Sequence, residues 1–184
     1  FGYDFRFGKG GSGDFHYTQT LLSGIDVGEA GSLADRGLIV SSSKIRENLK
    51  ASNIEEANRM LGYRYRLQGK VEEGQALGRT IGFPTANLRL PKEKLIPKNG
   101  VYAAKWHWEE KTYHAMVNIG TNPTVNPDGT KRFIEAHIMD FQGDLYGKSI
   151  TLELLDRIRD EKRFESLLEL KNQISKDALW FTKS

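Results

Sequence analysis

The 184-residue sequence contains no cysteine, so disulfide bonds, thiolate nucleophiles and zinc–thiolate sites are all excluded. It also lacks an apolar run near the roughly 18 residues that a membrane helix requires, and it shows no signal peptide. We therefore expect no association with a membrane. A cytoplasmic location is the expectation that agrees best with these absences.

Charge of one sign is not concentrated anywhere in the chain. The net charge is +3; residues 1–62 hold seven Lys or Arg and eight Asp or Glu, which leaves +4 for the remainder. A nucleic-acid-binding surface would show a basic stripe with interleaved aromatic residues, and none is present. We expect no nucleic-acid partner and infer no obligate protein partner. A mild positive balance favours small anions such as ATP.

One loop combines several groups that suit an anionic ligand. It reads Gly78-Arg79-Thr80-Ile81-Gly82-Phe83-Pro84-Thr85-Ala86-Asn87. The glycines permit close approach of backbone amides to an anion, and Arg79 adds a fixed positive charge. Thr85 and Asn87, two residues apart in extended chain, offer oxygens on one face that suit Mg²⁺. The alternative is a surface loop built from ordinary turn residues.

The second half of the chain shows the period-two alternation of β-strands. Runs near 65–71, 101–108, 112–119, 133–141 and 149–155 follow one another at short spacing. Gly69 indicates a bulge or a close approach within the first run. Without intervening helices, this pattern predicts an antiparallel sheet closing into a small barrel. Ser166 and Glu169 form a capping box before a C-terminal helix.

Glu135 is the candidate general base. In its strand, Ile134, Ala136 and Ile138 share one face, and Glu135 shares the opposite face with His137. The alternative for Glu135 is a solvated strand residue, and for His137 a packed or surface imidazole.

The N-terminal third is organised differently. Residues 1–24, rich in Gly and aromatic residues, read as a flexible loop. Ser41, Ser42 and Ser43 are candidate N-caps for a helix over 44–49. A second helix is predicted from Asn53, with Glu56 completing a capping box and Gly62 ending the helix.

The loop around Pro84-Thr85-Ala86-Asn87 resembles the nucleotide-binding signature of riboflavin kinases. The resemblance continues through Gly100-Val101-Tyr102, Asn118 to Thr124, Glu135-Ala136-His137, Leu145-Tyr146-Gly147 and Ile158 to Phe164, and it covers residues 63–184. It implies a mainly β fold: a six-stranded antiparallel Greek-key barrel with a C-terminal helix. The implied reaction transfers the γ-phosphate of ATP to the riboflavin 5′-hydroxyl, giving FMN and ADP.

The same resemblance implies roles for individual residues. Glu135 corresponds to the catalytic glutamate, and Thr85 and Asn87 to the ligands of Mg²⁺ or another divalent cation. Gly78, Arg79, Gly82, Phe83 and Pro84 would surround the nucleotide along with them. Arg159 and Phe164 would border the flavin.

Residues 1–62 resemble a different module, the C-terminal part of the FMN adenylyltransferase domain of bifunctional FAD synthetases. The matching pieces are Gly2 to Gly8 and Ser41 to Arg46. They imply an incomplete Rossmann-like segment and a bifunctional parent protein. Because the His-x-Gly-His motif of that family is absent, we expect residues 1–184 to form no FAD.

A second class of function remains open. A non-catalytic barrel that binds flavin or nucleotide could act as a ligand sensor or regulator. Such a binder needs no base, so the presence of Thr85, Asn87 and Glu135 together favours the kinase.

Overall fold

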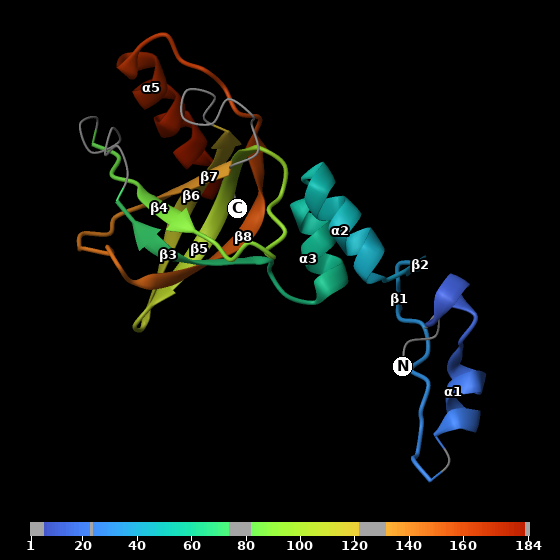
Figure 1. Ribbon diagram of the computed structural model, residues 1–184. Helices are drawn as coiled ribbons and strands as arrows, with labels where there is room; N and C mark the ends of the chain where they lie inside the picture. Colours follow the sequence, from blue (N-terminus) through green and yellow to red (C-terminus); the bar gives the residue numbers. More distant parts are fainter. Residues whose placement is uncertain (1–5, 23, 74–81, 122–131, 183–184) are drawn as a thin grey trace. The chain divides into compact units, whose positions relative to one another are not determined.

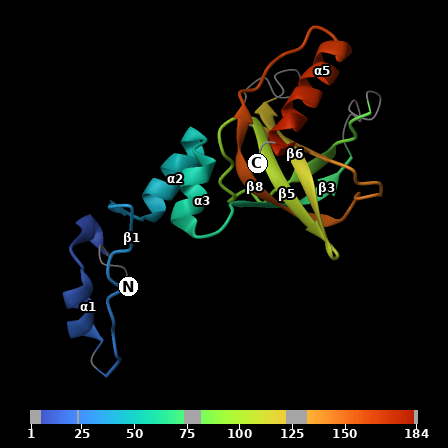
Figure 2. The same ribbon diagram turned by 180° about the vertical axis from the view of Figure 1, so that it is seen from behind.

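The computed structural model describes residues 6–22, 24–73, 82–121 and 132–182 (Figures 1 and 2). The chain divides into two compact units, residues 1–42 and 43–184. The elements of the first unit are a 3-10 helix (Lys9–Gly11), α1 (Phe15–Leu21), β1 (Ala34–Asp35) and β2 (Leu38–Ile39). Its described sheet is this one hairpin, so the Rossmann-like segment expected within residues 1–62 stays a proposal.

The helix α1 falls where the sequence predicted a flexible loop. Asp14 begins it, because the aspartate carboxylate accepts a hydrogen bond from the Tyr17 amide at 2.9 Å. The loop prediction is therefore wrong at α1. The glycine-rich stretch ends at Gly13, directly before Asp14, and a capped helical turn follows it.

Six antiparallel strands of the second unit close into a barrel (Figure 1). In chain order they are β3 (Arg66–Glu72), β4 (Ala86–Arg89), β5 (Gly100–Trp108), β6 (Lys111–Thr121), β7 (Arg132–Ile138) and β8 (Ser149–Arg159). The order around the barrel is β3-β4-β7-β6-β5-β8, and β8 returns to pair with β3. Since β5, β6 and β7 are successive neighbours and β8 lies beside β5, the predicted Greek-key barrel is confirmed.

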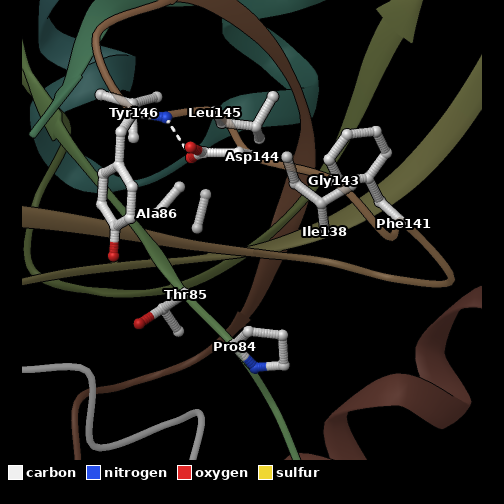
Figure 3. Close-up of a pocket in the computed structure, with 11 residues that line it drawn as sticks. Pro84, Thr85, Ala86, Ile138, Phe141, Gly143, Asp144, Leu145 and Tyr146 are labelled. Atoms are coloured by element: carbon white, nitrogen blue, oxygen red, sulfur yellow. Dashed lines mark hydrogen bonds between the residues drawn. The ribbon is translucent and has the colours of Figure 1, made fainter. Parts of the chain in front are cut away.

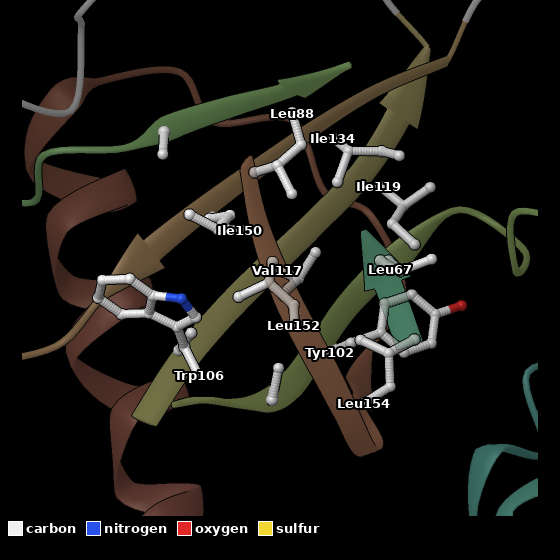
Figure 4. Close-up of a cluster of buried hydrophobic side chains, with 14 of the residues drawn as sticks. Leu67, Leu88, Tyr102, Trp106, Val117, Ile119, Ile134, Ile150, Leu152 and Leu154 are labelled. Atoms are coloured by element: carbon white, nitrogen blue, oxygen red, sulfur yellow. The ribbon is translucent and has the colours of Figure 1, made fainter. Parts of the chain in front are cut away.

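Inward-facing apolar side chains from the strands fill the barrel interior (Figure 4). The largest interior side chains, all essentially inaccessible to solvent, are Leu67, Tyr102, Trp106, Val117, Ile119, Leu152 and Leu154. On β7 the buried residues are Ile134, Ala136 and Ile138, so Glu135 lies on the outer surface of the barrel. β7 ends at Ile138 rather than at residue 141 as predicted, because Asp140 turns the chain with φ at 58°.

Two helices, α2 (Ser42–Ala51) and α3 (Ile54–Leu61), precede the barrel, and the buried cluster that fills the barrel extends to them. Asn58 joins α3 to the barrel: its amide donates to the Leu154 carbonyl at 2.9 Å and its side-chain oxygen accepts from the Tyr65 amide at 2.7 Å. The compact unit therefore begins about twenty residues before Tyr63, where the sequence resemblance begins.

The predicted ends of α3 are correct only in part. Gly62 ends the helix in the left-handed conformation, with φ at 73°, as expected. Asn53 occupies the N-cap position, but its side chain donates to Asn48 instead of capping the helix. Glu56, the predicted partner in a capping box, is paired with Arg59. The prediction of a capping box at the start of α3 is therefore wrong.

The C-terminal helix α5 (Leu167–Ala178) begins at Ser166, whose hydroxyl accepts from the Glu169 amide at 3.2 Å, and continues into a 3-10 helix (Leu179–Thr182). Phe181 stacks on His114 of β6, with ring centroids 4.6 Å apart. Leu167 and Leu168 remain exposed, so the start of α5 does not pack through them. No described helix combines the length and the apolar character needed to cross a bilayer.

The close approach expected at Gly69 gives a stability prediction. A Cβ at Gly69 would lie 2.6 Å from the carbonyl oxygen of Arg89 and 2.8 Å from Cδ2 of Leu90. Gly69→Ala should therefore force β3 away from the end of β4, lowering the free energy of unfolding by about 1–3 kcal/mol in urea denaturation. Gly31→Ala is the control, since its Cβ would meet nothing within 4 Å. Equal stability of the two variants would contradict the steric argument.

Candidate active site

Three polar side chains line up across the outside of the barrel. Glu135 on β7 is paired with Asn87 on β4 and, on its other side, with Asn118 on β6. Residues directly opposite each other in antiparallel strands project from the same face. We call Asn87, Glu135 and Asn118 the polar row. The structure thus brings the predicted base next to one of the predicted metal ligands.

The polar row has few protein partners. All three side chains are half-buried, and none of them takes part in a hydrogen bond or ion pair within the described residues. Burial raises the pKa of the Glu135 carboxyl above its usual value, because removal from water disfavours the charged form. Polar groups that are partly withdrawn from water normally have partners, so these side chains are well placed to contact a ligand.

Asn118 is a site residue that sequence reasoning did not select. Strand alternation places it on the face of Met116 and His114, but only the register of β6 with β7 brings it opposite Glu135. The available signal was its position in the Asn118-Ile119-Gly120 stretch that carries the family resemblance.

The predicted nucleotide-binding loop is described from Gly82 onward. Gly78 and Arg79 lie outside the described residues. Gly82 adopts φ at 85°, a left-handed conformation that glycine reaches without strain. The next residues are fixed by His137 of β7: its Nδ1 lies 2.8 Å from the Pro84 carbonyl oxygen, and its ring meets the Phe83 ring edge-on at 5.1 Å. The loop is therefore attached to the strand that carries Glu135.

Thr85 and Asn87 retain the arrangement expected of paired oxygen donors. Both are half-buried, while Ala86 between them faces the interior. The described residues contain no cluster of three or more His, Asp or Glu side chains that could hold a metal by themselves. A cation at Thr85 and Asn87 would therefore take its other ligands from phosphate oxygens and water. That donor set suits a hard divalent cation.

A pocket opens beside Thr85, where β4 begins and β7 ends (Figure 3). Its volume is about 70 Å³. It is lined by Val71, Pro84, Thr85, Ala86, Ala136, Ile138, Phe141, Gly143, Asp144, Leu145 and Tyr146. The small side chains of Ala86 and Ala136 leave the space, and apolar groups of the β7–β8 loop form the opposite wall. Leu145 and Tyr146 carried the family resemblance, but sequence reasoning gave them no role.

Arg159 lies further along the line of the polar row. Val101 on β5 is paired with Asn118 on one side and with Arg159 of β8 on the other. Three strand spacings separate Glu135 from Arg159, about 14 Å along the barrel surface. In a closed barrel of six strands, three spacings are half of the circumference, so the two predicted regions, base and flavin border, lie on opposite sides of the barrel wall.

Arg159 is fixed by the C-terminal helix. Its Nε lies 3.0 and 2.9 Å from the two carboxylate oxygens of Asp177, and its Nη2 lies 2.8 Å from one of them. Asp177 is 5% exposed. The guanidinium also lies 5.7 Å from the ring centroid of Phe164. Arg159 and Phe164 are thus adjacent, and Asp177 is a partner of Arg159 that the sequence did not indicate.

Related proteins identify the family to which the barrel belongs. The family model for riboflavin kinase (flavokinase) matches residues 61–183. The bifunctional riboflavin kinase/FMN adenylyltransferase of Escherichia coli K12 is 41% identical over 181 residues, which is 97% of this chain and 57% of that protein. The Bacillus subtilis protein of the same name is 38% identical over 182 residues, covering 96% of this chain and 56% of the relative.

A solved structure described as a macrolide-efflux protein from Streptococcus pneumoniae is also similar. The TM-score is 0.83 at 34% identity, covering 96% of this chain and 57% of that one. This chain thus spans a little over half the length of the relatives it matches. The matched family model covers about two thirds of the chain, including the whole barrel and the polar row, and on that ground the chain belongs to the riboflavin kinase family.

Proposed function

We propose that the barrel is a riboflavin kinase that transfers the γ-phosphate of ATP to the 5′-hydroxyl of riboflavin, giving FMN and ADP. The observation that carries the proposal is the pairing of half-buried Glu135 with Asn87 of the nucleotide-binding signature. A strand glutamate that only faced solvent would need neither burial nor a signature residue opposite it.

Glu135 acts as the general base. Its carboxylate accepts the proton of the 5′-hydroxyl while the hydroxyl oxygen bonds to the γ-phosphorus and the bond from that phosphorus to the bridging oxygen of ADP breaks. Burial raises the pKa of Glu135, which makes its carboxylate a better proton acceptor than a solvated one. Most of the remaining acceleration comes from positioning and charge stabilisation.

Thr85 and Asn87 would hold a divalent cation, for which we propose Mg²⁺. When bound, such a cation neutralises charge on the phosphate oxygens. Gly82 is free to turn its backbone towards a phosphate. By the family resemblance, Gly78, Arg79, Phe83 and Pro84 complete the nucleotide site; this assignment is part of the proposal.

The two substrates would approach Glu135 from opposite sides. The pocket beside Thr85 offers apolar walls for the base of the nucleotide. Arg159 and Phe164 lie three strands further around the barrel, beyond β6 and β5, where the flavin ring would bind. Riboflavin would then extend across β5 and β6 to bring its terminal hydroxyl to Glu135, between the two sites.

For residues 1–62 we propose an origin in an FMN adenylyltransferase domain, as in the bifunctional relatives, with residues 63–184 as the kinase domain. We further propose that the protein works in the cytoplasm, without nucleic acid, membrane or an obligate protein partner. Incubation of residues 1–184 with riboflavin and Mg-ATP, followed by chromatography, tests the kinase. FMN should accumulate without FAD, whereas a ligand sensor would bind riboflavin and leave it unphosphorylated.

Glu135→Gln should lower kcat by about 10²–10⁴, since the amide keeps the shape of the side chain but cannot accept a proton. The KM for riboflavin should change little, because the lost interaction matters mainly in the transition state. Glu110→Gln, in the exposed turn between β5 and β6, is the control and should keep the parent kcat. Near-normal turnover of Glu135→Gln in steady-state kinetics would remove Glu135 as the base.

The pKa of Glu135 also predicts how this variant's stability depends on pH. A carboxyl whose pKa is higher in the folded than in the unfolded protein loses its favourable contribution as pH rises through the folded value. Ionised Glu135 should therefore oppose folding near pH 7. Glu135→Gln should melt at or above the parent temperature at pH 7, and the difference should vanish below about pH 4. A lower melting temperature at pH 7 would indicate a structural role.

Thr85→Ala combined with Asn87→Ala should abolish metal-dependent ATP binding with little change in thermal stability. The two oxygens would serve the cation, and neither side chain belongs to the buried core. Isothermal titration calorimetry with Mg-ATP measures the loss, and Thr112→Ala on the exposed end of the β5–β6 hairpin controls for removal of a strand hydroxyl. Unchanged affinity in the double variant would exclude both residues as metal ligands.

A further inference from the structure

His137 stands where the ladder between β4 and β7 stops. The last two pairs are Asn87 with Glu135 and Ala86 with Ala136. Continued by one step, the register would bring Thr85 opposite His137. Thr85 precedes β4, however, and is not part of the ladder. No strand hydrogen bond between β4 and β7 therefore fixes the backbone of the nucleotide-binding loop at this point.

The side chain of His137 provides the missing attachment one residue further on. A carbonyl oxygen can only accept, so the 2.8 Å contact requires that Nδ1 of His137 carries a hydrogen and donates it to Pro84. Proline has no amide hydrogen, which leaves the carbonyl as its only backbone group for hydrogen bonding. The edge-on contact with Phe83, at 71° between the ring planes, adds a second hold on the loop.

Thr85 is consequently held from both sides. On one side the Ala86 pair joins the chain to β7, and on the other side His137 holds Pro84. Both attachments belong to β7, two residues or fewer from Glu135. The position of the Thr85 hydroxyl relative to the Glu135 carboxylate is thus set within one strand.

We propose that His137 is a positioning residue of the kinase: its Nδ1 hydrogen holds the Pro84 carbonyl and thereby fixes Thr85 for the metal–nucleotide complex. This inference rests on the proposed function. His137 need not touch substrate or take a proton. Its loss should weaken binding of the metal–nucleotide complex, while the flavin region near Arg159, on the far side of β6 and β5, is unaffected.

Three substitutions of His137 distinguish the effect of its hydrogen bond from the effect of the size of its ring. His137→Asn places an amide N–H near the position of Nδ1, His137→Gln places it near Nε2 instead, and His137→Phe keeps the ring without a donor. The Gln and Phe variants should raise the KM for Mg-ATP by about 3- to 10-fold, the range expected for one hydrogen bond. The KM for riboflavin should stay within about twofold, and His137→Asn should restore the parent KM for Mg-ATP.

Calorimetry with Mg-ADP provides a readout that does not depend on turnover, with the same ranking of affinities expected. His107→Phe, on the exposed hairpin end of β5, is the matched control and should behave like the parent. Parent-like Mg-ADP affinity in His137→Phe would overturn the proposal, and so would a failure of His137→Asn to rescue. An equal loss of riboflavin affinity and melting temperature in all three variants would also overturn it, in favour of a structural role. A parent chain that binds both ligands but forms no FMN would instead refute the proposed kinase.

Discussion

Closure of the barrel at β4 is the constraint on which the site depends. β4 has four residues; three of them pair with β3 and two pair with β7. The two pairs with β7 serve opposite faces of the barrel wall, since Ala86 and Ala136 fill the inside while Asn87 and Glu135 lie opposite each other on the outside. Because a barrel must pair every strand edge, the same two contacts that close the sheet also bring Glu135 opposite Asn87.

This short junction contrasts with the rest of the sheet. β5 and β6 share nine consecutive pairs, and the largest buried side chains, Trp106 and Tyr102, both come from β5. The well-paired strands provide a rigid frame, whereas the polar row begins on the least-paired strand, β4, and its half-buried polar groups have no partners among the described residues. Functional sites commonly concentrate such unfavourable features where the remaining structure can tolerate them. In the proposed kinase, the outer face of β7 would be such a place.

How far the sequence predicts a feature depends on whether the residues that determine it are close together or far apart along the chain. Alternation is local, so the strands, a small antiparallel barrel and the position of Glu135 opposite its apolar neighbours could be foreseen, whereas the Greek-key order was implied by the family resemblance. Register is not local, and the neighbours of Glu135 therefore emerged only from the structure, as with Asn118. Local signals also fail where two local partners compete: Glu56 pairs with Arg59 three residues later instead of completing the cap at Asn53. Likewise, no period in α5 marks Asp177 as the partner of Arg159.

The two ends of the proposed site are held by different interactions. Glu135 and Asn87 are placed by backbone pairing, which fixes their Cα atoms directly. Arg159 reaches its position through a long side chain, whose guanidinium is held by the buried carboxylate of Asp177 and by the Asp160 carbonyl. An ion pair can rearrange when a ligand brings its own polar groups, whereas a strand ladder cannot slip without turning every side chain to the other face. In the proposed kinase, the rigid end would hold the reacting phosphate, where small displacements are most damaging to the rate, and the adjustable end would accept the flavin.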